Sequence, residues 1–559
     1  MRTKNSIKNV IYAFIGQFLG IIISFIARYI FIKKLGAEYL GITGLFNNIL
    51  NILSFTELGI GTSIAVALYE PLENKNYEKL KALMRMFKKI YVSIGFIVIL
   101  LGLMFLPFYR LTMSEVPDIP NLDLIYILFV LINAVSYFYS YKRTLVISDQ
   151  KRYIASFYRY LFYFILNVVQ ILVLILFENY IFFLFVQLLF TLLENYMLSR
   201  KVDKIYIEIK NADDNYKISN NDLKKIKDTI KNIIFHKFGG IVLKTTDNIC
   251  ISKLLGVFYV GIYSNYYMIT SALDTVISQV FNSVVASVGN LNVSKSKEKM
   301  HNVFNKLFFM NQWIYCFVCV CIYVLSNDFI TLWLGEEYVI NNIVLLAIVG
   351  DFYIHGMRKT CLAYREATGN YKIDRFSPIV EAIINIISSI IFTLKFGLIG
   401  VFIGTILSCL LTCFWIEPLV IYRKSFNLKS NEYFLQYIKY FFVFAISLLI
   451  TVSLTSLINE INFLNFILKC IVSLIIPNVI LSILFVNNKN FKYYFSLLKK
   501  GDRWFYVIWF IITFDIHNIM YVIYNLQIRY FVTNYNFFFN FSVSHFMRFC
   551  RIKWLEYYF

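Results

Sequence analysis

The chain has 559 residues, of which 59% are apolar and 16% are charged, and its formal net charge is +21. Apolar runs of about 20 residues recur along the whole length, which excludes a soluble globular protein and predicts membrane-spanning helices. The lysines and arginines lie in the short segments between these runs. That placement follows the positive-inside rule and argues against nucleic acid as a partner.

Taken in chain order, the apolar runs predict fourteen membrane spans. The first run, residues 10–31, is followed by no small-residue cleavage site, so we expect it to stay in the protein as a span. The fourteen predicted spans are centred near Ile21, Leu53, Ile97, Phe129, Leu166, Val186, Val242, Ser271, Val318, Ala347, Ile386, Ile406, Phe444 and Leu474.

The charge of the predicted loops alternates along the chain, so that every second loop is rich in Lys and Arg. The loops between them are short and neutral or acidic, apart from Lys33 and Lys34. By the positive-inside rule, this pattern places the N-terminus and the basic segments in the cytoplasm. The segments rich in Lys and Arg are 70–89, 142–152, 199–231, 295–306, 358–375 and 423–439.

The sequence contains an internal repeat. Residues 33–42 (KKLGAEYLGI) return 220 positions later as residues 253–262 (KLLGVFYVGI). Two copies of one unit are the usual construction of a membrane transporter, with the substrate site between the halves. Because both halves have the same pattern of six spans, we expect them to be related by an axis along the membrane normal. Three further anchors recur in the same order: 7–11 as 230–234, 78–79 as 298–299, and 142–144 as 358–360.

We therefore predict an all-α polytopic membrane protein with about fourteen transmembrane helices. Two pseudo-symmetric six-helix lobes are expected around a central cavity, with two extra helices after them. The predicted units are an N-terminal lobe over 1–200, a cytoplasmic linker over 201–231, a C-terminal lobe over 232–425, two additional helices over 426–490 and an aromatic-rich tail over 491–559, to which the sequence assigns no role.

Ionisable side chains lie inside several predicted spans, where each costs about 2.5–3.5 kcal/mol and therefore faces water or a partner. Arg28 and Lys244 occupy the first and seventh spans, which correspond under the repeat, and Asp247 follows Lys244 by one turn. Glu57 and Asp274 occupy the second and eighth spans, which also correspond. We interpret these charges as the lining of one central cavity. The alternative is two structural pairs, Arg28–Glu57 and Lys244–Asp274, with Arg28 reaching the outer headgroups.

The second predicted span also carries a polar stripe. Asn47, Asn51 and Ser54 fall on one helical face, at i, i+4 and i+7. Such a stripe suits contact with a hydroxyl-rich ligand, and it equally suits hydrogen bonds between helices.

The sequence contains no Walker motif, nucleophile elbow or cluster of metal ligands. Cys316, Cys319 and Cys321 form a group inside an apolar run without nearby histidine, which is typical of small buried side chains. We therefore expect no catalytic residue, no metal site and no cofactor, and we expect that the protein is not an enzyme.

Several of these segments resemble one family. They are residues 7–9 (IKN), 34–41 (KLGAEYLG), 57–61 (ELGIG), 246–248 (TDN) and 252–256 (SKLLG). In this order they are similar to segments of the polysaccharide repeat-unit flippases (Wzx type). These flippases belong to the multidrug/oligosaccharidyl-lipid/polysaccharide exporter superfamily. The resemblance covers about residues 5 to 490 and is greatest to members from low-GC bacteria.

The resemblance implies a transporter of the bacterial cell (cytoplasmic) membrane that works by alternating access. It implies that undecaprenyl-diphosphate-linked oligosaccharide repeat units are flipped from the cytoplasmic to the outer leaflet, for export and assembly of a cell-surface polysaccharide. Membrane lipids are implied partners, and a polysaccharide polymerase and other assembly proteins are further candidates.

A diphosphate does not enter hydrocarbon unpaired, so the resemblance makes Arg28 and Lys244 its expected ligands. Asn47 and Asn51 are the candidates for contact with the sugars. The family is associated with ion gradients, and Glu57, Asp247 and Asp274 are the candidates to carry a proton or Na⁺.

Three other interpretations are open. An ion-coupled multidrug or small-solute antiporter of the same superfamily would favour an acidic, aromatic cavity, whereas Arg28 and Lys244 favour an anionic substrate. A polysaccharide polymerase or other membrane enzyme would be expected to carry a sizeable outer loop, and the predicted outer loops are short. A non-transporting scaffold would be insensitive to neutralisation of the cavity charges.

Overall fold

The computed structural model describes residues 2–499, apart from 54–56, 58–59, 214–215, 217, 294–296, 369–373 and 375. In this part of the chain every regular element is helical. The predicted tail lies outside the described residues from position 500 onward. The α-helices are α1 (Arg2–Leu35), α2 (Ala37–Leu53), α3 (Ile60–Glu73), α4 (Tyr77–Phe105), α5 (Leu122–Tyr137), α6 (Ser140–Ser148), α7 (Arg152–Phe177), α8 (Tyr180–Ile205), α9 (Ile207–Asn211), α10 (Asn220–Leu254), α11 (Val257–Val293), α12 (Lys297–Trp333), α13 (Asn342–Met357), α14 (Lys359–Thr368), α15 (Ser377–Phe396), α16 (Leu398–Leu411), α17 (Cys413–Ile421), α18 (Asn431–Thr455), α19 (Phe463–Phe485) and α20 (Lys489–Lys499).

The outer faces of the helices are suited to lipid. Nine of the described helices are long and apolar enough to cross a membrane, and the bent pair α5–α6 (41°) raises this to ten. Leu394, Leu435 and Leu464 on three of these helices are each 70% exposed. Exposed apolar faces of this extent mark a lipid or protein contact rather than a water-facing surface. The chain is an all-α polytopic membrane protein, and the count of fourteen spans stays a prediction.

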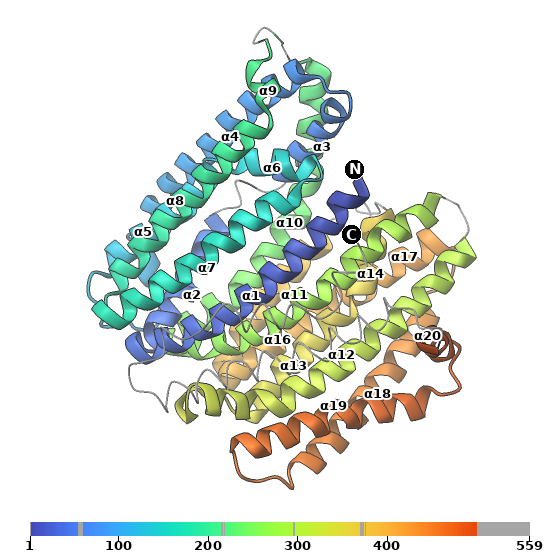
Figure 1. The fold of residues 1–559 in the computed structure, drawn as a ribbon. Helices are drawn as coiled ribbons and strands as arrows, with labels where there is room; N and C mark the ends of the chain where they lie inside the picture. The colour runs from blue at the N-terminus through green and yellow to red at the C-terminus, as the bar shows by residue number, and fades with distance from the viewer. Residues whose placement is uncertain are drawn as a thin grey trace, which may run out of the picture.

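The same helix pairs pack together in each half of the chain. In the first half α1 packs on α7, α4 on α5, and α8 on both α5 and α7. In the second half α10 packs on α15, α12 on α13, and α16 on both α13 and α15. Because the sequence repeat equates α1 with α10 and α4 with α12, these contacts describe two pseudo-symmetric lobes, α1–α8 and α10–α17. Figure 1 shows the first lobe above the second.

Short polar side chains begin several helices. Asn76, Asn179, Ser219 and Asn462 each accept a hydrogen bond from the backbone N–H three residues later, at 2.9–3.1 Å. These bonds satisfy N–H groups that have no partner within the first turn of a helix. Ser219 starts α10, so this 35-residue helix begins inside the segment 201–231 that the sequence predicts as a linker.

Two glycines at equivalent positions of the repeat turn the chain. Gly36 (φ 87°) joins α1 to α2, and Gly256 (φ 111°) joins α10 to α11. Side chains with a Cβ atom rarely adopt these backbone angles, so glycine is the residue that permits each turn. The Leu-Gly pair of the repeat therefore encodes the same corner in both lobes.

Helix α12 connects the second lobe to the two helices that follow it. Gln312 donates from Nε2 to the carbonyl of Tyr440 on α18 (2.9 Å) and accepts from the Tyr353 hydroxyl on α13 (2.7 Å). Trp313 donates from Nε1 to Asn478 Oδ1 on α19 (2.8 Å). Helices α18 and α19 therefore lie against α12, on the lower face of the second lobe in Figure 1.

Candidate functional site

Arg28 joins the two lobes. It lies half-buried near the end of α1, and its Nη1 donates to Ser264 Oγ (2.9 Å) and Asn265 Oδ1 (3.4 Å) on α11. Both acceptors are neutral, so among the described residues no carboxylate balances this guanidinium. Glu57, the alternative partner that the sequence suggests, instead accepts a hydrogen bond from the Tyr91 hydroxyl on α4 (3.4 Å).

The other predicted cation, Lys244, is on α10, and its side chain lies outside the described part of the structure. Asn47 and Asn51 are exposed on α2, one turn apart, whereas Phe46 and Leu50 beside them are buried. Helix α2 belongs to the first lobe and packs against α10 and α11 of the second. Exposed amides on such a helix are available to a polar ligand.

Asp274 on α11 is paired with Lys359, the first residue of α14. The distance from Lys359 Nζ to Asp274 Oδ1 is 2.9 Å, and the Tyr315 hydroxyl donates to the same oxygen (3.3 Å). Side-chain exposure is 45% for Asp274 and 16% for Lys359. A carboxylate this exposed in the middle of a long apolar helix needs water rather than lipid beside it, so we infer that this part of α11 is hydrated.

Asp247 on α10 belongs to a cluster of side-chain oxygens that α15 and α16 complete. Thr405 Oγ1 donates to Asp247 Oδ1 (3.2 Å) and accepts from Asn385 Nδ2 (3.0 Å). Asn385 Oδ1 accepts in turn from Thr246 Oγ1 (2.9 Å). Asp351 and His355 of α13 also lie within electrostatic range of Asp247. A half-buried carboxylate beside hydroxyl and amide oxygens is an arrangement that can hold a proton or a hard cation.

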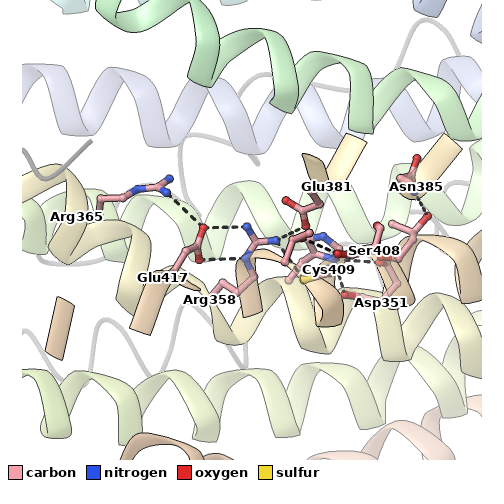
Figure 2. Close-up of polar contacts among 11 residues, drawn as sticks. Asp351, Arg358, Arg365, Glu381, Asn385, Ser408, Cys409 and Glu417 are labelled. Atoms are coloured by element: carbon pink, nitrogen blue, oxygen red, sulfur yellow. Dashed lines mark hydrogen bonds and ion pairs between the residues drawn. The ribbon is translucent and has the colours of Figure 1, made fainter. Parts of the chain in front are cut away.

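A second polar cluster surrounds Arg358, the residue after α13 (Figure 2). Its Nη1 donates to Glu381 Oε1 on α15 (2.9 Å). Its Nε and Nη2 donate to the two oxygens of Glu417 on α17 (3.1 and 2.9 Å), which is the bidentate geometry of a strong ion pair. Exposure is 12% for the Arg358 side chain and 2% for each glutamate, so the pair is almost fully removed from solvent.

The cluster continues to α14. Arg365 Nη1 lies 2.7 Å from Asp374 Oδ2 and 3.4 Å from Glu417 Oε1, and Figure 2 shows Arg365 on the far side of Glu417 from Arg358. Two guanidinium groups thus face three carboxylates. These contacts tie α13, α14, α15 and α17 together at one end of the second lobe.

His355, Glu381 and Cys409 place one potential metal-ligand atom each within 4.8 Å of the others. Arg358 Nη1 is already 2.9 Å from Glu381 Oε1 and 3.2 Å from Cys409 Sγ. The guanidinium therefore occupies the neighbourhood of these donors, and its positive charge opposes a metal ion there.

The Arg358 cluster is the part of the site that sequence reasoning missed. In the sequence, Arg358 opens the basic segment 358–375, whose charge predicts a cytoplasmic loop, whereas much of it folds as α14. Two signals point to the cluster: Glu381 and Glu417 lie in apolar runs and need a cation. Arg358 also belongs to one of the repeated anchors.

No known family model matches the chain, and no curated protein matches its sequence. Solved structures do match its fold. The lipid II flippase MurJ in an inward closed conformation has a TM-score of 0.60 and 16% identity, covering 86% of this chain and 99% of the flippase. An inward-facing multidrug resistance MATE family transporter of the MOP superfamily has a TM-score of 0.57 and 15% identity, covering 71% and 91%. A mutant of the Vibrio cholerae MATE transporter VcmN has a TM-score of 0.54 and 12% identity, covering 75% and 96%. The chain therefore has the fold of these transporters.

Proposed function

We propose that the protein is a flippase of the Wzx type in the multidrug/oligosaccharidyl-lipid/polysaccharide exporter superfamily. Its substrate is an oligosaccharide repeat unit linked to undecaprenyl diphosphate, which it moves to the outer leaflet of the bacterial cytoplasmic membrane. The lobes α1–α8 and α10–α17 alternate in opening to the two sides. A polysaccharide polymerase that uses the delivered units is a partner within this proposal.

The observation that carries the proposal is that Arg28 has only uncharged hydrogen-bond acceptors among the described residues. Its hydrogen-bond acceptors, Ser264 and Asn265, carry no charge, unlike those of Arg358 and Arg365. An unbalanced guanidinium between two membrane lobes favours an anionic ligand, and a phosphate is the anion that arginine holds in bidentate geometry. Lys244 is the second proposed phosphate ligand, on the helix that corresponds to α1.

The fold is shared by a lipid II flippase and by multidrug transporters, so it is compatible with a lipid substrate. The flippase structure aligns with 86% of this chain, whereas the two MATE structures align with 71% and 75%. Fold alone does not assign a substrate, so this difference adds weight only in combination with the charge of Arg28. Asn47 and Asn51, exposed on α2, are the proposed sugar contacts.

For ion coupling, the oxygen cluster of Asp247, Asn385 and Thr405 is the favoured site. Asp274 is already neutralised by Lys359, and Glu57 has a tyrosine partner. Purified protein in proteoliposomes with an imposed Na⁺ or proton gradient tests the assignment. We expect Asp247→Asn to abolish the response to the gradient, whereas Asp274→Asn should retain it.

The second candidate function is a cation-exporting antiporter, which the half-buried acid Asp247 and the MATE fold favour. The two functions differ in the charge of the substrate. An antiporter should depend on Asp247 and tolerate Arg28→Ala, and cells lacking it should become sensitive to organic cations.

The deciding experiment counts lipid-linked repeat units in the cytoplasmic leaflet of a deletion strain. The strain is complemented with wild type, Arg28→Ala, Lys244→Ala or Lys424→Ala at matched expression. Lys424 is the control because it is an exposed cation outside the repeat and outside the proposed ligand set. We expect accumulation in the deletion strain and in the first two variants only. A deletion strain without accumulation would reject the proposed substrate.

A further inference from the structure

The two copies of the repeated segment lie against each other. Residues 33–42 end α1 and begin α2, and residues 253–262 end α10 and begin α11. Helices α2 and α11 pack together, one from each lobe. The repeat is thus the surface on which the lobes meet, as well as a sign of common construction.

Two glycines let the backbones approach on this surface. A Cβ atom on Gly41 would lie 2.0 Å from the carbonyl oxygen of Val257, and one on Gly261 would lie 2.2 Å from the carbonyl oxygen of Ala37. Distances this short allow no side chain without movement of the helices. Small residues at such crossings are what close helix packing in membranes requires.

The contact is reciprocal under the repeat. Ala37 corresponds to Val257 and Gly41 corresponds to Gly261, so each copy places its glycine on the first helical residue of the other. Such self-complementarity is the property of a two-fold interface between identical subunits. Here it is formed within one chain.

Hydrogen bonds cross between the lobes at the same end. The backbone N–H of Ser114 donates to the carbonyl of Ser252 (3.0 Å), and Lys253 Nζ donates to the carbonyl of Met113 (3.3 Å). The turn that carries Met113 and Ser114 is held to α5 by Arg110, which donates to both oxygens of Asp123 (3.0 Å each). Arg28 adds its bonds to α11 beside the glycine crossing.

At the other end the start of α10 still contacts the first lobe, with Asp222 Oδ2 3.2 Å from Lys79 Nζ on α4, but α9 and α17 are apart. Figure 1 shows α9 of the first half far from α17 of the second, whereas α2 and α11 meet at the opposite end of the bundle. The closed end carries the Gly36 and Gly256 turns. The loop charges predict this end to be extracytoplasmic.

We propose that the two repeat copies form a self-complementary gate that seals the extracytoplasmic end and must part in each transport cycle. This inference rests on the proposed function as an alternating-access transporter. The gate consists of backbone packing and of hydrogen bonds to neutral acceptors, and among the residues described above for this contact no ion pair joins one lobe to the other. Such contacts can be broken and remade without separating a buried ion pair.

The first test measures the distance between the two lobes at the cytoplasmic end, and it requires no substrate. Spin labels are placed on cysteines at Lys210 on α9 and Lys424 after α17, which are both exposed. The free cysteines that the structure describes are all buried, and Cys550, which lies outside the described residues, is replaced by serine so that the introduced cysteines label selectively. Gly41→Ala and Gly261→Ala should each force the gate apart and shift the label separation to shorter values. Gly350→Ala, whose Cβ atom would meet its nearest neighbour at an ordinary 3.6 Å, should leave the separation unchanged.

The second test locks the gate. A Cβ atom on Gly44 would lie 3.3 Å from Cγ1 of Val260, so a cysteine pair at these positions is within disulfide reach. Oxidation of Gly44→Cys/Val260→Cys should abolish export, and a reducing agent should restore it. The matched controls are the single variants Gly44→Cys and Val260→Cys, which place the same thiols on the gate without a partner, so oxidation should not reduce their export.

The outcomes distinguish a failure of the gate proposal from a failure of the proposed substrate. Unchanged label separations in both glycine variants, or undiminished export by the oxidised Gly44/Val260 pair, would overturn the gate. Shifted separations in a protein whose deletion strain accumulates no lipid-linked oligosaccharide would support the gate and reject the substrate alone.

Discussion

Removal of Arg358 should destabilise the second lobe more than any exposed charge does. In Arg358→Met the two glutamates beside it, Glu381 and Glu417, lose a guanidinium that contacts them at 2.9–3.1 Å. Arg365 still lies 3.4 Å from Glu417, so Glu381 is the carboxylate left without a cation. At 2% exposure, it gains little compensation from water.

The expected cost follows from this burial. Breaking a buried ion pair by removing one partner costs about 3–5 kcal/mol, because the remaining charge is desolvated and unpaired. At about 1.4 kcal/mol for each factor of ten, the unfolding equilibrium should move by two to nearly four powers of ten. The control is Arg110→Met: Arg110 also contacts both oxygens of one carboxylate, that of Asp123, but the two side chains are 53% and 54% exposed. A surface pair of this kind contributes about 0–1 kcal/mol.

Unfolding of the purified protein in mixed micelles, followed by circular dichroism as denaturing detergent is added, measures both variants. A second substitution then tests the cause. Because Glu381→Gln removes the uncompensated charge, Arg358→Met/Glu381→Gln should be more stable than Arg358→Met alone. If the double variant is instead less stable, by the sum of the two single losses, the buried-charge explanation is refuted.

Two further predictions concern packing and a partly exposed pair. A Cβ atom on Gly356 would lie 1.9 Å from the Tyr315 ring, so Gly356→Ala should lower stability by about 1–3 kcal/mol in the same titration, whereas Gly350→Ala on the same helix should change it little. The pair Lys359–Asp274 should show a coupling energy below about 1 kcal/mol in a double-mutant cycle with Lys359→Met and Asp274→Asn, because Asp274 is 45% exposed. A coupling of several kcal/mol would mean that water does not reach Asp274.

The membrane class and the two-lobe plan could be predicted from the sequence because short continuous segments are enough to specify both. Each apolar run is long enough to span whatever lies beside it, and each repeat copy specifies its own Leu-Gly corner at Gly36 or Gly256. The position of Arg28, Asp247 and Asp274 within apolar runs was visible for the same reason, because the residues that flank a charge are read from the sequence alone.

The partners of those charges were decided by tertiary structure. Arg28 bonds to Ser264 and Asn265 rather than to Glu57, and Asp274 pairs with Lys359 on α14. Helical periodicity tells which face of a helix a residue occupies, but it does not tell which of the other helices lies against that face. That choice depends on how the helices of two lobes pack at once. The sequence by itself determined where charges fall within apolar runs, and only the packing decided which charges are neutralised and which, like Arg28, have no charged partner among the described residues.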